Sequence, residues 1–368
     1  MKILSIVGTR PEAVKMAPVI LALADAPDIF STFCVTGQHR ALIAPVLDFF
    51  DIVPDFVLDV MAPGQGLNAL TARLIEGLDA VLAAARPDRV IVQGDTTTAL
   101  AGALAAFHRA IPVAHVEAGL RTYCPAAPFP EEVNRRTIAL LADMHFAPTP
   151  TSRDNLGGER VHGAVYVTGN TGVDALQFAL AAIDGDAPEP APARKLIVVT
   201  CHRRESFGAP FSSICAALER LDRRADVDIV FPRHPNPALD EALAGLRSVP
   251  PMGLIDFLRL LRRADLILTD SGGVQEEAVA LGKPVVVLRD VTERPEGVTA
   301  GIATLAGSDA DRIVQAAEAL LDTAPRRREA ACVYGDGRAA ARIVDVLLGR
   351  PIEEFAPLAQ GDRVREIV

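Results

Sequence analysis

Three carboxylates in the first half of the chain stand where an apolar run ends or where a helix is expected to begin. Asp95 follows the run RVIVQG, Glu117 follows IPVAHV, and Glu131 comes directly after Pro130. One acid at such a position is usually a helix cap or half of a salt bridge. Three acids turned toward one cleft would instead repel one another, so that one holds a proton while another does not. General acid–base chemistry at neutral pH requires such an arrangement.

The stretch DSGGVQEEAVAL has the composition of a phosphate-binding helix start. Ser271 can cap the helix, while Gly272 and Gly273 allow a ligand to approach backbone N–H groups at the positive end of the helix dipole. Glu276 and Glu277, about one turn further on, could accept hydrogen bonds from ribose hydroxyls. An ordinary capped helix with solvated acids explains the same letters, so this segment alone leaves both interpretations open.

Cations and a histidine follow other predicted strands. Arg10 and Lys15 come after the first strand, His202 after KLIVVTC, and Arg294 after PVVVL. Guanidinium and ammonium groups from both halves would serve as fixed counter-charges for a diphosphate. A lone histidine is more often structural than catalytic, but the position of His202 after a strand and beside two arginines leaves both roles open. The first strand ends in Gly8 without the G-x-G-x-x-G signature of a dinucleotide site.

The candidate residues can act together only if strands and helices bring them to one edge of a sheet. Apolar residues at every position are typical of strands covered on both faces, and such runs alternate with helical patterns along the chain. The predicted strands are ILSIV, STFCVTG, RVIVQGD, IPVAHVEAG, DMHFAPT and AVYVTGN in the first half and KLIVVTCH, VDIVFPRH, ADLILTDSGG and KPVVVLRD in the second. The fold class is therefore α/β, with two doubly wound parallel sheets. Such sheets bind ligands beyond the C-terminal strand ends, where the candidate residues stand.

A Pro-, Ala- and Asp-rich stretch, DGDAPEPAPAR at residues 184–194, is typical of a loop near a domain junction. We expect an N-terminal Rossmann-like domain over residues 1–170 and a C-terminal Rossmann-like domain over residues 171–350. A tail, residues 351–368, is expected to pack back on the first domain. The segment GRAAARIVDVLLGR, residues 337–350, has helical apolar spacing and is expected to dock on a domain.

Composition excludes several classes of function. The chain has 368 residues, enough for two domains, and its net charge of −10 argues against a general nucleic-acid surface. There is no run of about 18 apolar residues, so no membrane span is expected, and the opening apolar run is too short for a signal peptide. The cysteines lie far apart without a C-x-x-C pair, so neither a zinc site nor a disulfide framework is predicted. We expect a cytoplasmic protein with reduced thiols and no metal.

Several blocks, in order, resemble the bacterial non-hydrolysing UDP-N-acetylglucosamine 2-epimerases. They are GTRPEAVKMAPVI, TGQH, QGDTTTALAGALAAF, HVEAGLRT, PEEVNR, HRRESFG, DSGGVQEEA, GKPVVVLRDVTERPE and GDGRAAARIV, and they cover residue 2 to about residue 348. The resemblance implies the glycosyltransferase-B architecture, with two Rossmann-like domains facing across a cleft, and a homodimer. It also implies reversible interconversion of UDP-N-acetylglucosamine and UDP-N-acetylmannosamine for bacterial surface polysaccharides, with UDP as a further ligand and no cofactor.

Site residues carry over where the motifs match. The residues implied to hold UDP are Arg10, Lys15, His202, Ser271, Gly272, Gly273, Glu277 and Arg294, and those implied to serve the chemistry are Asp95, Glu117, Glu131 and His202. Some family members bind a second substrate molecule as an activator, which implies Gln38, His39 and Gln65 as an allosteric set. The chain departs from the family at Gly64, where an arginine is usual, and at residues 123–128, which lack the usual polar side chains.

The mechanism implied by the resemblance is elimination followed by re-addition. A base removes the C2 proton as UDP leaves C1, a 2-acetamidoglucal forms, and UDP adds back while C2 is protonated on the other face. No hydride moves, so no nicotinamide is required. Alternatives stay open: a hydrolysing relative that releases UDP and N-acetylmannosamine, a glycosyltransferase of the same fold, a non-catalytic nucleotide-sugar sensor, and an epimerase of a 2,3-diacetamido uronic acid nucleotide.

Overall fold

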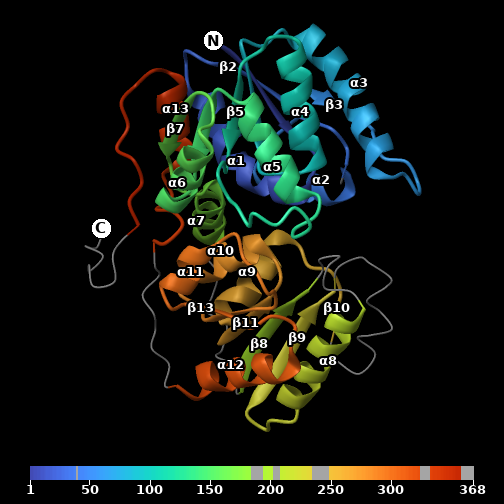
Figure 1. The fold of residues 1–368 in the computed structure, drawn as a ribbon, viewed down its shortest axis with the longest axis vertical. Coiled ribbons are helices and arrows are strands. Elements are labelled where there is room, and N and C mark those ends of the chain that lie inside the picture. The colour runs from blue at the N-terminus through green and yellow to red at the C-terminus, as the bar shows by residue number, and fades with distance from the viewer. Residues whose placement is uncertain (39, 184–193, 202–207, 234–247, 324–331, 358–368) are drawn as a thin grey trace. The chain divides into compact units, whose positions relative to one another are not determined.

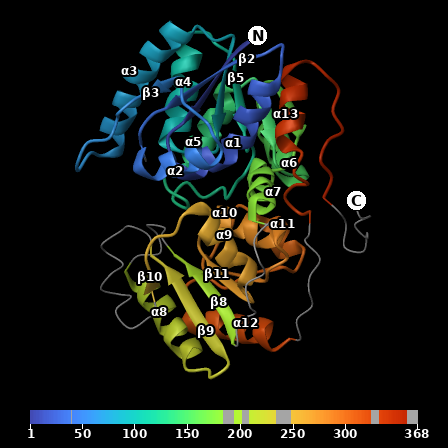
Figure 2. The ribbon, with the colours of Figure 1, turned by 180° about the vertical axis from the view of Figure 1, so that it is seen from behind.

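The chain folds into two α/β units, each built around its own parallel sheet (Figures 1 and 2). The computed structural model describes residues 1–38, 40–183, 194–201, 208–233, 248–323 and 332–357. Unit 1 consists of Met1–Ala175 and Tyr334–Pro357, and unit 2 takes up the described part of Leu176–Val333.

Unit 1 contains a seven-stranded parallel sheet with the order β3-β2-β1-β4-β5-β6-β7. Its strands are β1 (Lys2–Val7), β2 (Phe30–Val35), β3 (Phe56–Val57), β4 (Arg89–Gln93), β5 (Val113–Val116), β6 (Met144–Ala147) and β7 (Ala164–Val167). Its helices are α1 (Arg10–Asp25), α2 (Arg40–Phe49), α3 (Leu67–Ala85), α4 (Thr97–His108), α5 (Glu131–Leu141), α6 (Pro150–Glu159) and α13 (Ala339–Leu347), and α7 (Thr171–Ile183) runs on into unit 2.

Both faces of the unit 1 sheet are covered, as uninterrupted apolar strands require. On one face, Leu4 and Ile6 of β1 and Val90 and Val92 of β4 pack with buried side chains of α3, α4 and α5. On the other face, α1 packs against both α2 and α13 (Figure 2). The strand ends are therefore the part of this sheet where side chains are left for chemistry.

Unit 2 contains a six-stranded parallel sheet with the order β10-β9-β8-β11-β12-β13. Its strands are β8 (Lys195–Thr200), β9 (Val227–Pro232), β10 (Ser248–Val249), β11 (Leu266–Thr269), β12 (Val285–Val287) and β13 (Ala303–Leu305). Its helices are α8 (Ala209–Asp222), α9 (Leu254–Arg263), α10 (Gly272–Ala280), α11 (Pro295–Thr299) and α12 (Ala310–Asp322). Phe211 of α8 and Ile313 of α12 share one buried cluster with Ile197 of β8.

Every strand predicted from an apolar run is present, and the predicted α/β class with two doubly wound sheets is confirmed. The prediction missed β3, β10 and β13, which have two or three residues each. All three lie at a sheet edge, where a strand has one partner and needs few covered side chains. The predicted loop, residues 184–194, lies outside the described residues apart from Arg194. Among the helices that the structure describes, none combines the length and apolar character needed to cross a membrane.

The chain returns to unit 1 at Tyr334, and the returning segment completes that unit. The backbone N–H of Asn170 donates to the carbonyl of Tyr334 at 2.8 Å, and that of Phe355 donates to the carbonyl of Val167 at 2.8 Å. The predicted docking helix is α13, which packs on α1. The structure therefore differs from the predicted domain boundaries: residues 334–350, expected in the second domain, belong to unit 1 because α13 covers α1.

Arg342 of α13 ties this segment together, and its removal should destabilise unit 1. Its guanidinium donates to Asp336 at 2.6 and 2.7 Å and to the carbonyl oxygens of Glu353 and Thr168 at 2.8 and 3.0 Å. We expect Arg342→Ala to lower the free energy of unfolding by about 2 to 3 kcal/mol, because a partly buried carboxylate and two carbonyls lose their donor. Urea unfolding followed by far-UV circular dichroism measures this change.

The matched control for Arg342 is Arg350→Ala. Arg350, just beyond the end of α13, is half exposed and pairs with Asp345 of α13 at 3.2 Å. Loss of an exposed pair costs at most about 1 kcal/mol, so the urea midpoint should move much less than in Arg342→Ala. Equal midpoints for the two variants would contradict the anchoring role of Arg342.

Candidate active site

Each sheet has a point where the order of its strands reverses, and both points lie beside predicted site residues. In unit 1 the reversal falls between the adjacent strands β1 and β4, and in unit 2 it falls between β8 and β11. Open parallel sheets bind ligands beyond the C-terminal strand ends at such points. β1 leads to Arg10, β4 to Asp95 and β11 to Ser271. The topology thus places each of these residues at the ligand-binding edge of its own unit.

Glu117 directly follows β5, and two side chains from other elements hold it. Lys15 of α1 donates to Glu117 Oε2 in a buried ion pair, and Asn170 Nδ2 donates to the same oxygen at 3.3 Å. The backbone of Glu117 has a φ of +63°, in the left-handed region that non-glycine residues seldom adopt. Residues in such conformations cluster at functional sites, where surrounding contacts fix them. The structure fixes this carboxylate and balances its charge with an ammonium group.

Asp95 follows β4 and is tied to the first turn of α5. Its carboxylate pairs with Arg135 at 3.0 Å, and its backbone carbonyl accepts from Asn134 Nδ2 at 2.8 Å. Arg135 Nε also donates to the carbonyl of Glu131, the first residue of α5, at 3.4 Å. A single arginine therefore holds Asp95 and the start of the helix that carries Glu131.

Asp95, Glu117 and the start of α5, which carries Glu131, lie at one edge of the unit 1 sheet. β4 and β5 are adjacent, and a Cβ atom at Gly94 would lie 3.8 Å from Glu117 Oε1. The Glu117 carboxylate therefore reaches the turn that carries Asp95, to which the start of α5 is tied. Two of the acids have a cationic partner that the sequence did not reveal: Arg135 on α5 pairs with Asp95, and Lys15 on α1 pairs with Glu117. The division of the acids into a proton donor and a proton acceptor stays a prediction.

A buried histidine supports this edge from below, and sequence reasoning missed it. His115 lies within β5, and its Nε2 is 2.7 Å from the carbonyl oxygen of Gly94. Burial lowers the pKa of His115 to about 3, so the imidazole stays neutral at physiological pH. A histidine inside the apolar run VAHV is the signal that could have revealed it, because only a hydrogen-bonded ring fits such a position.

Glu132, next to the predicted Glu131, was also missed. It is fully buried, and its two carboxylate oxygens accept from the backbone N–H groups of Thr122 and Tyr123 at 3.0 Å each. These contacts fix the start of the loop at residues 123–128, where the sequence departs from the family it resembles. Helix phase decides which of two adjacent acids turns inward, and the letters PEEVNRR do not fix that phase.

In unit 2, α10 begins at Gly272, with Ser271 at the predicted N-cap position. The predicted capping hydrogen bond is wrong: within the described structure the Ser271 side chain makes none, whereas its backbone N–H donates to Thr269 Oγ1 at 2.9 Å. The first N–H groups of a helix have no partner within the helix and attract anions. This helix start therefore keeps the properties of a diphosphate seat without a side-chain cap.

Arg294 is buried against the start of α10, where two carboxylates hold its guanidinium. Its Nε donates to Glu276 Oε1 at 2.6 Å, and its Nη1 donates to Glu293. A Cβ atom at Gly272 would overlap the guanidinium of Arg294, so glycine is needed for this close approach. The cation thus lies beside the predicted diphosphate seat, with its charge already shared by carboxylates.

The carboxylates around Arg294 also bear on the hypothesis about ribose. Of the two predicted candidates for a ribose acceptor, Glu276 is buried and holds Arg294, which leaves Glu277 as the candidate. Glu277 is partly buried, and its role stays a prediction. Glu293 accepts a second time, from Arg289 at 2.8 Å. The buried set thus contains two arginines and two glutamates, and its charges balance.

Comparison with known proteins gives one consistent family. The family model described as UDP-N-acetylglucosamine 2-epimerase matches residues 21–348. The UDP-N-acetylglucosamine 2-epimerase of Escherichia coli K12 is 47% identical over 369 residues, covering 94% of this chain and 98% of that protein. The chain belongs to the UDP-N-acetylglucosamine 2-epimerase family. The resemblance found in the sequence is therefore confirmed.

Solved structures agree with this epimerase family and with its fold. A UDP-GlcNAc 2-epimerase from Neisseria meningitidis, bound to UDP-GlcNAc, has a TM-score of 0.91 at 41% identity, covering 95% of this chain and 100% of that chain. A glycotransferase of kitacinnamycin is similar in fold alone, with a TM-score of 0.59 at 17% identity, covering 93% of this chain and 98% of that chain. The predicted glycosyltransferase-B class, with two Rossmann-like domains, is confirmed.

The structure does not describe every residue that the epimerase resemblance implied. His202 and His39 lie outside the described residues. Gln38 accepts from Thr98 Oγ1 at 2.9 Å, and Gln65 accepts from an arginine of α3 at 3.0 Å. The allosteric role of Gln38, His39 and Gln65 stays a prediction. Within the described ranges, no group of three or more His, Cys, Asp or Glu side chains is arranged to hold a metal ion.

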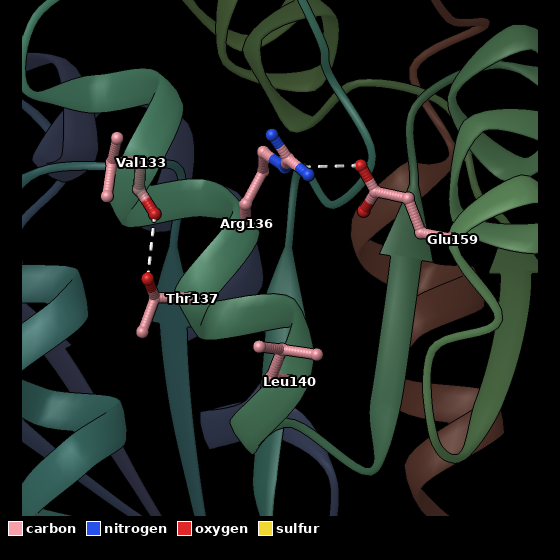
Figure 3. Close-up of a pocket in the computed structure, with 5 residues that line it drawn as sticks. All are labelled: Val133, Arg136, Thr137, Leu140 and Glu159. Carbon is pink, nitrogen blue, oxygen red and sulfur yellow. Dashed lines mark hydrogen bonds and ion pairs between the residues drawn. The ribbon is translucent and has the colours of Figure 1, made fainter. Parts of the chain in front are cut away.

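A hollow on the outer face of α5 lies apart from the predicted site residues of this epimerase-family chain. It has a volume of about 410 Å³ and is lined by Val133, Arg136, Thr137, Leu140 and Glu159 (Figure 3). Arg136 turns toward Glu159 at 3.5 Å, and Thr137 donates to the carbonyl of Val133 at 2.8 Å (Figure 3). The charged groups of this lining pair with each other, and none of the predicted catalytic acids is among them.

Proposed function

We propose that this chain interconverts UDP-N-acetylglucosamine and UDP-N-acetylmannosamine without hydrolysing either. Family membership supports the activity, and the Neisseria relative is bound to UDP-GlcNAc. The observation that supports the proposal is that Asp95 and Glu117 lie at one sheet edge, each paired with a cation, and that the same arginine contacts the start of α5, which carries Glu131. Inversion at C2 needs one group that removes a proton and one that returns it, which is more than a simple glycosyl transfer requires.

The proposed reaction has two steps. In the first, a carboxylate takes the proton from C2 while the C1–O bond breaks, its electron pair leaves with UDP, and a C1–C2 double bond forms in a 2-acetamidoglucal. In the second, UDP adds back at C1 while C2 receives a proton on the opposite face. We assign the proton transfers to Asp95, Glu117, Glu131 and His202. Positioned proton transfer of this kind supplies about 10² to 10⁴ in rate.

Departure of UDP needs positive charge at the diphosphate, because the C2 proton is only weakly acidic. We assign UDP binding in unit 2 to the α10 start with Arg294, and in unit 1 to Arg10; the assigned residues are Ser271, Gly272, Gly273, Glu277, Arg294, Arg10 and His202. Lys15 was implied as a further UDP residue. Because it pairs with Glu117, we assign it to orienting that carboxylate.

The reaction moves protons and a diphosphate but no hydride. The proposal therefore includes no nicotinamide and no other redox cofactor. From the family resemblance it further includes a homodimer, a cytoplasmic location and a role in supplying nucleotide sugars for polysaccharide biosynthesis.

Incubation with UDP-N-acetylglucosamine in D₂O tests the proposed function directly. We expect proton NMR to show loss of the C2 proton signal and appearance of the manno epimer while the nucleotide sugar stays intact, because C2 is reprotonated from solvent-exchanged groups. Accumulation of UDP and free N-acetylmannosamine would indicate the hydrolysing reaction instead. Turnover only after addition of a sugar acceptor would indicate a glycosyltransferase, and binding without exchange would indicate a sensor.

A further inference from the structure

Glu12 is a buried carboxylate to which the proposed chemistry gives no role. It is the third residue of α1, and its side chain is 1% exposed. Its Oε2 accepts from the backbone N–H groups of Gly8 and Thr9, at 3.1 and 2.7 Å, and its Oε1 accepts from Thr96 Oγ1 at 2.8 Å. The carboxylate therefore holds three donors from two separate turns.

These two turns carry residues of the candidate site. Gly8 and Thr9 lead from β1 into Arg10, and Thr96 directly follows Asp95 after β4. The Thr96 hydroxyl also accepts from the backbone N–H of Ala99 at 3.0 Å, which makes it the N-cap of α4. Glu12 thus joins the turn with the proposed diphosphate cation to the turn with a proposed catalytic acid, at the strand reversal of unit 1.

The packing around Gly8 leaves little room for these turns to shift. A Cβ atom at Gly8 would overlap the hydroxyl groups of Thr98 on α4 and Thr36 after β2. These two hydroxyls lie 3.1 Å apart and form a hydrogen bond. The backbone at Gly8 therefore packs against this pair of threonine side chains. A side chain that clamps this backbone from the α1 side fixes its position relative to α4.

We propose that Glu12 is a positioning residue for the epimerisation, which sets the turn of Arg10 relative to the turn of Asp95. The effect on turnover rests on the proposed reaction and the effect on UDP binding rests on the proposed role of Arg10, whereas the effect on stability rests on neither. A displacement of about 1 Å at reacting groups can cost about 10²-fold in rate. Loss of the link should therefore be visible in kcat even though Glu12 touches no reacting atom.

The link holds in both charge states of Glu12. Burial raises the pKa of Glu12 to about 7, and its hydrogen bonds to Thr96, Gly8 and Thr9 lower the pKa by a smaller amount. Its bonded partners are all neutral, and the nearest charged groups in sequence are Arg10 and Lys15 on α1 and Asp95 beside Thr96. A protonated carboxyl would donate to Thr96 Oγ1 and still accept from the two backbone N–H groups. Glutamine has the same donor and acceptors, so it should reproduce this state.

Other titratable groups on the elements that pack against α1 belong to different contacts. Among the described side chains they are Lys2 of β1, Cys34 of β2, Asp48 of α2, Arg89 of β4, and Arg342 and Asp345 of α13. The hydrogen bonds of the Glu12 carboxylate go to the two turns alone within the described structure. A change in the protonation of Glu12 therefore alters its hydrogen bonds to those two turns.

The activity test compares Glu12→Ala and Glu12→Gln with wild type, using C2 exchange in D₂O. We expect Glu12→Ala to lower kcat about 10²-fold and Glu12→Gln to stay within about threefold of wild type. Asp25→Asn, at the exposed end of the same helix, is the matched control and should leave kcat unchanged. An unchanged kcat in Glu12→Ala, or an equal loss in both Glu12 variants, would overturn the positioning role.

A second pair of variants covers the case in which Glu12→Ala does not fold. Thr96→Val removes the hydroxyl that bonds Glu12, and Thr96→Ser retains it. We expect kcat to fall at least tenfold in Thr96→Val and to recover to at least a third of the wild-type value in Thr96→Ser. Equal kcat values in the two variants would overturn the proposal, since the hydroxyl that bonds Glu12 would then have no effect on turnover.

Two measurements without turnover separate this proposal from the proposed function. Calorimetric titration with UDP should show an affinity about tenfold weaker in Glu12→Ala than in Glu12→Gln, because the Arg10 turn is released. The Tm of wild type should also fall relative to that of Glu12→Gln as pH rises from about 4.5 to 7, because the folded state holds the Glu12 proton more tightly than the unfolded chain. If wild type shows no C2 exchange, the proposed function fails, yet both measurements still test the link. Equal UDP affinities and parallel Tm curves would overturn it.

Discussion

Replacing Glu117 by glutamine is expected to lower the rate of C2 proton exchange about 10³-fold while UDP binds with nearly wild-type affinity. The carboxylate is held by Lys15 and Asn170 in a left-handed backbone conformation at the end of β5. An amide keeps the shape but neither takes a proton from carbon nor returns one. Glu117 is not among the residues assigned to UDP binding, so nucleotide affinity is expected to change little. Exchange by NMR and UDP titration by calorimetry give the two numbers.

The control for Glu117→Gln is another ion-paired carboxylate of unit 1. Asp143, just before β6, pairs with Arg89 at the start of β4, so it lies at the N-terminal edge of the sheet. Asp143→Asn should leave exchange within about twofold of wild type, since that edge carries no proposed chemistry. A comparable loss in both variants would point to general destabilisation, and unchanged exchange in Glu117→Gln would end the assignment of this residue.

The second large effect is expected at the glycine beside Arg294. Gly272→Ala should weaken UDP binding about 30-fold, because the new Cβ atom overlaps a guanidinium that two carboxylates hold in place. Either the arginine or the start of α10 must move, and both belong to the proposed diphosphate seat. Gly253→Ala is the matched control: Gly253 precedes α9 in the same unit, and open space surrounds an added Cβ there. Its UDP affinity should stay within about twofold of wild type.

A double variant tests the cause of this loss. If Gly272→Ala acts by displacing Arg294, then its effect should largely vanish once Arg294 is already replaced by alanine. We expect Arg294→Ala alone to weaken UDP binding at least tenfold. The UDP affinity of the double variant should stay within about twofold of that of Arg294→Ala. Additive losses would show that the methyl group obstructs UDP itself, and unchanged affinity in both single variants would remove this helix start from the proposed site.

The frame of the site was predictable because strands covered on both faces must be apolar at every position. Runs such as KLIVVT and RVIVQ satisfy this condition, and the residues that follow them fall at the ligand-binding edge by topology alone. Asp95, Glu117 and Ser271 were found in this way. Strands at sheet edges are not predicted in this way. An edge strand pairs with one neighbour and is only partly covered, so its two or three residues need not all be apolar.

The partners of the site residues could not be predicted, because no local pattern records them. Lys15 and Glu117 are 102 residues apart in sequence, and Asn170 lies 53 residues beyond Glu117. Whether a helix turns one residue or its neighbour toward the sheet depends on how the helix packs. Packing of α5 is what buries Glu132 more deeply than Glu131. Burial of Glu276 with Arg294 was equally hidden, since it depends on the absence of a side chain at Gly272.

Unit 1 is assembled from both ends of the described chain, with unit 2 inserted between them. On the ribosome, α1 emerges about 300 residues before α13, the helix that packs on it. The face of α1 that α13 covers must therefore stay uncovered, or be shielded by a chaperone, throughout the synthesis of unit 2. A translation product halted before Tyr334 would contain every proposed acid of unit 1 but would lack α13 and the backbone hydrogen bonds to Asn170 and Val167 that complete the unit.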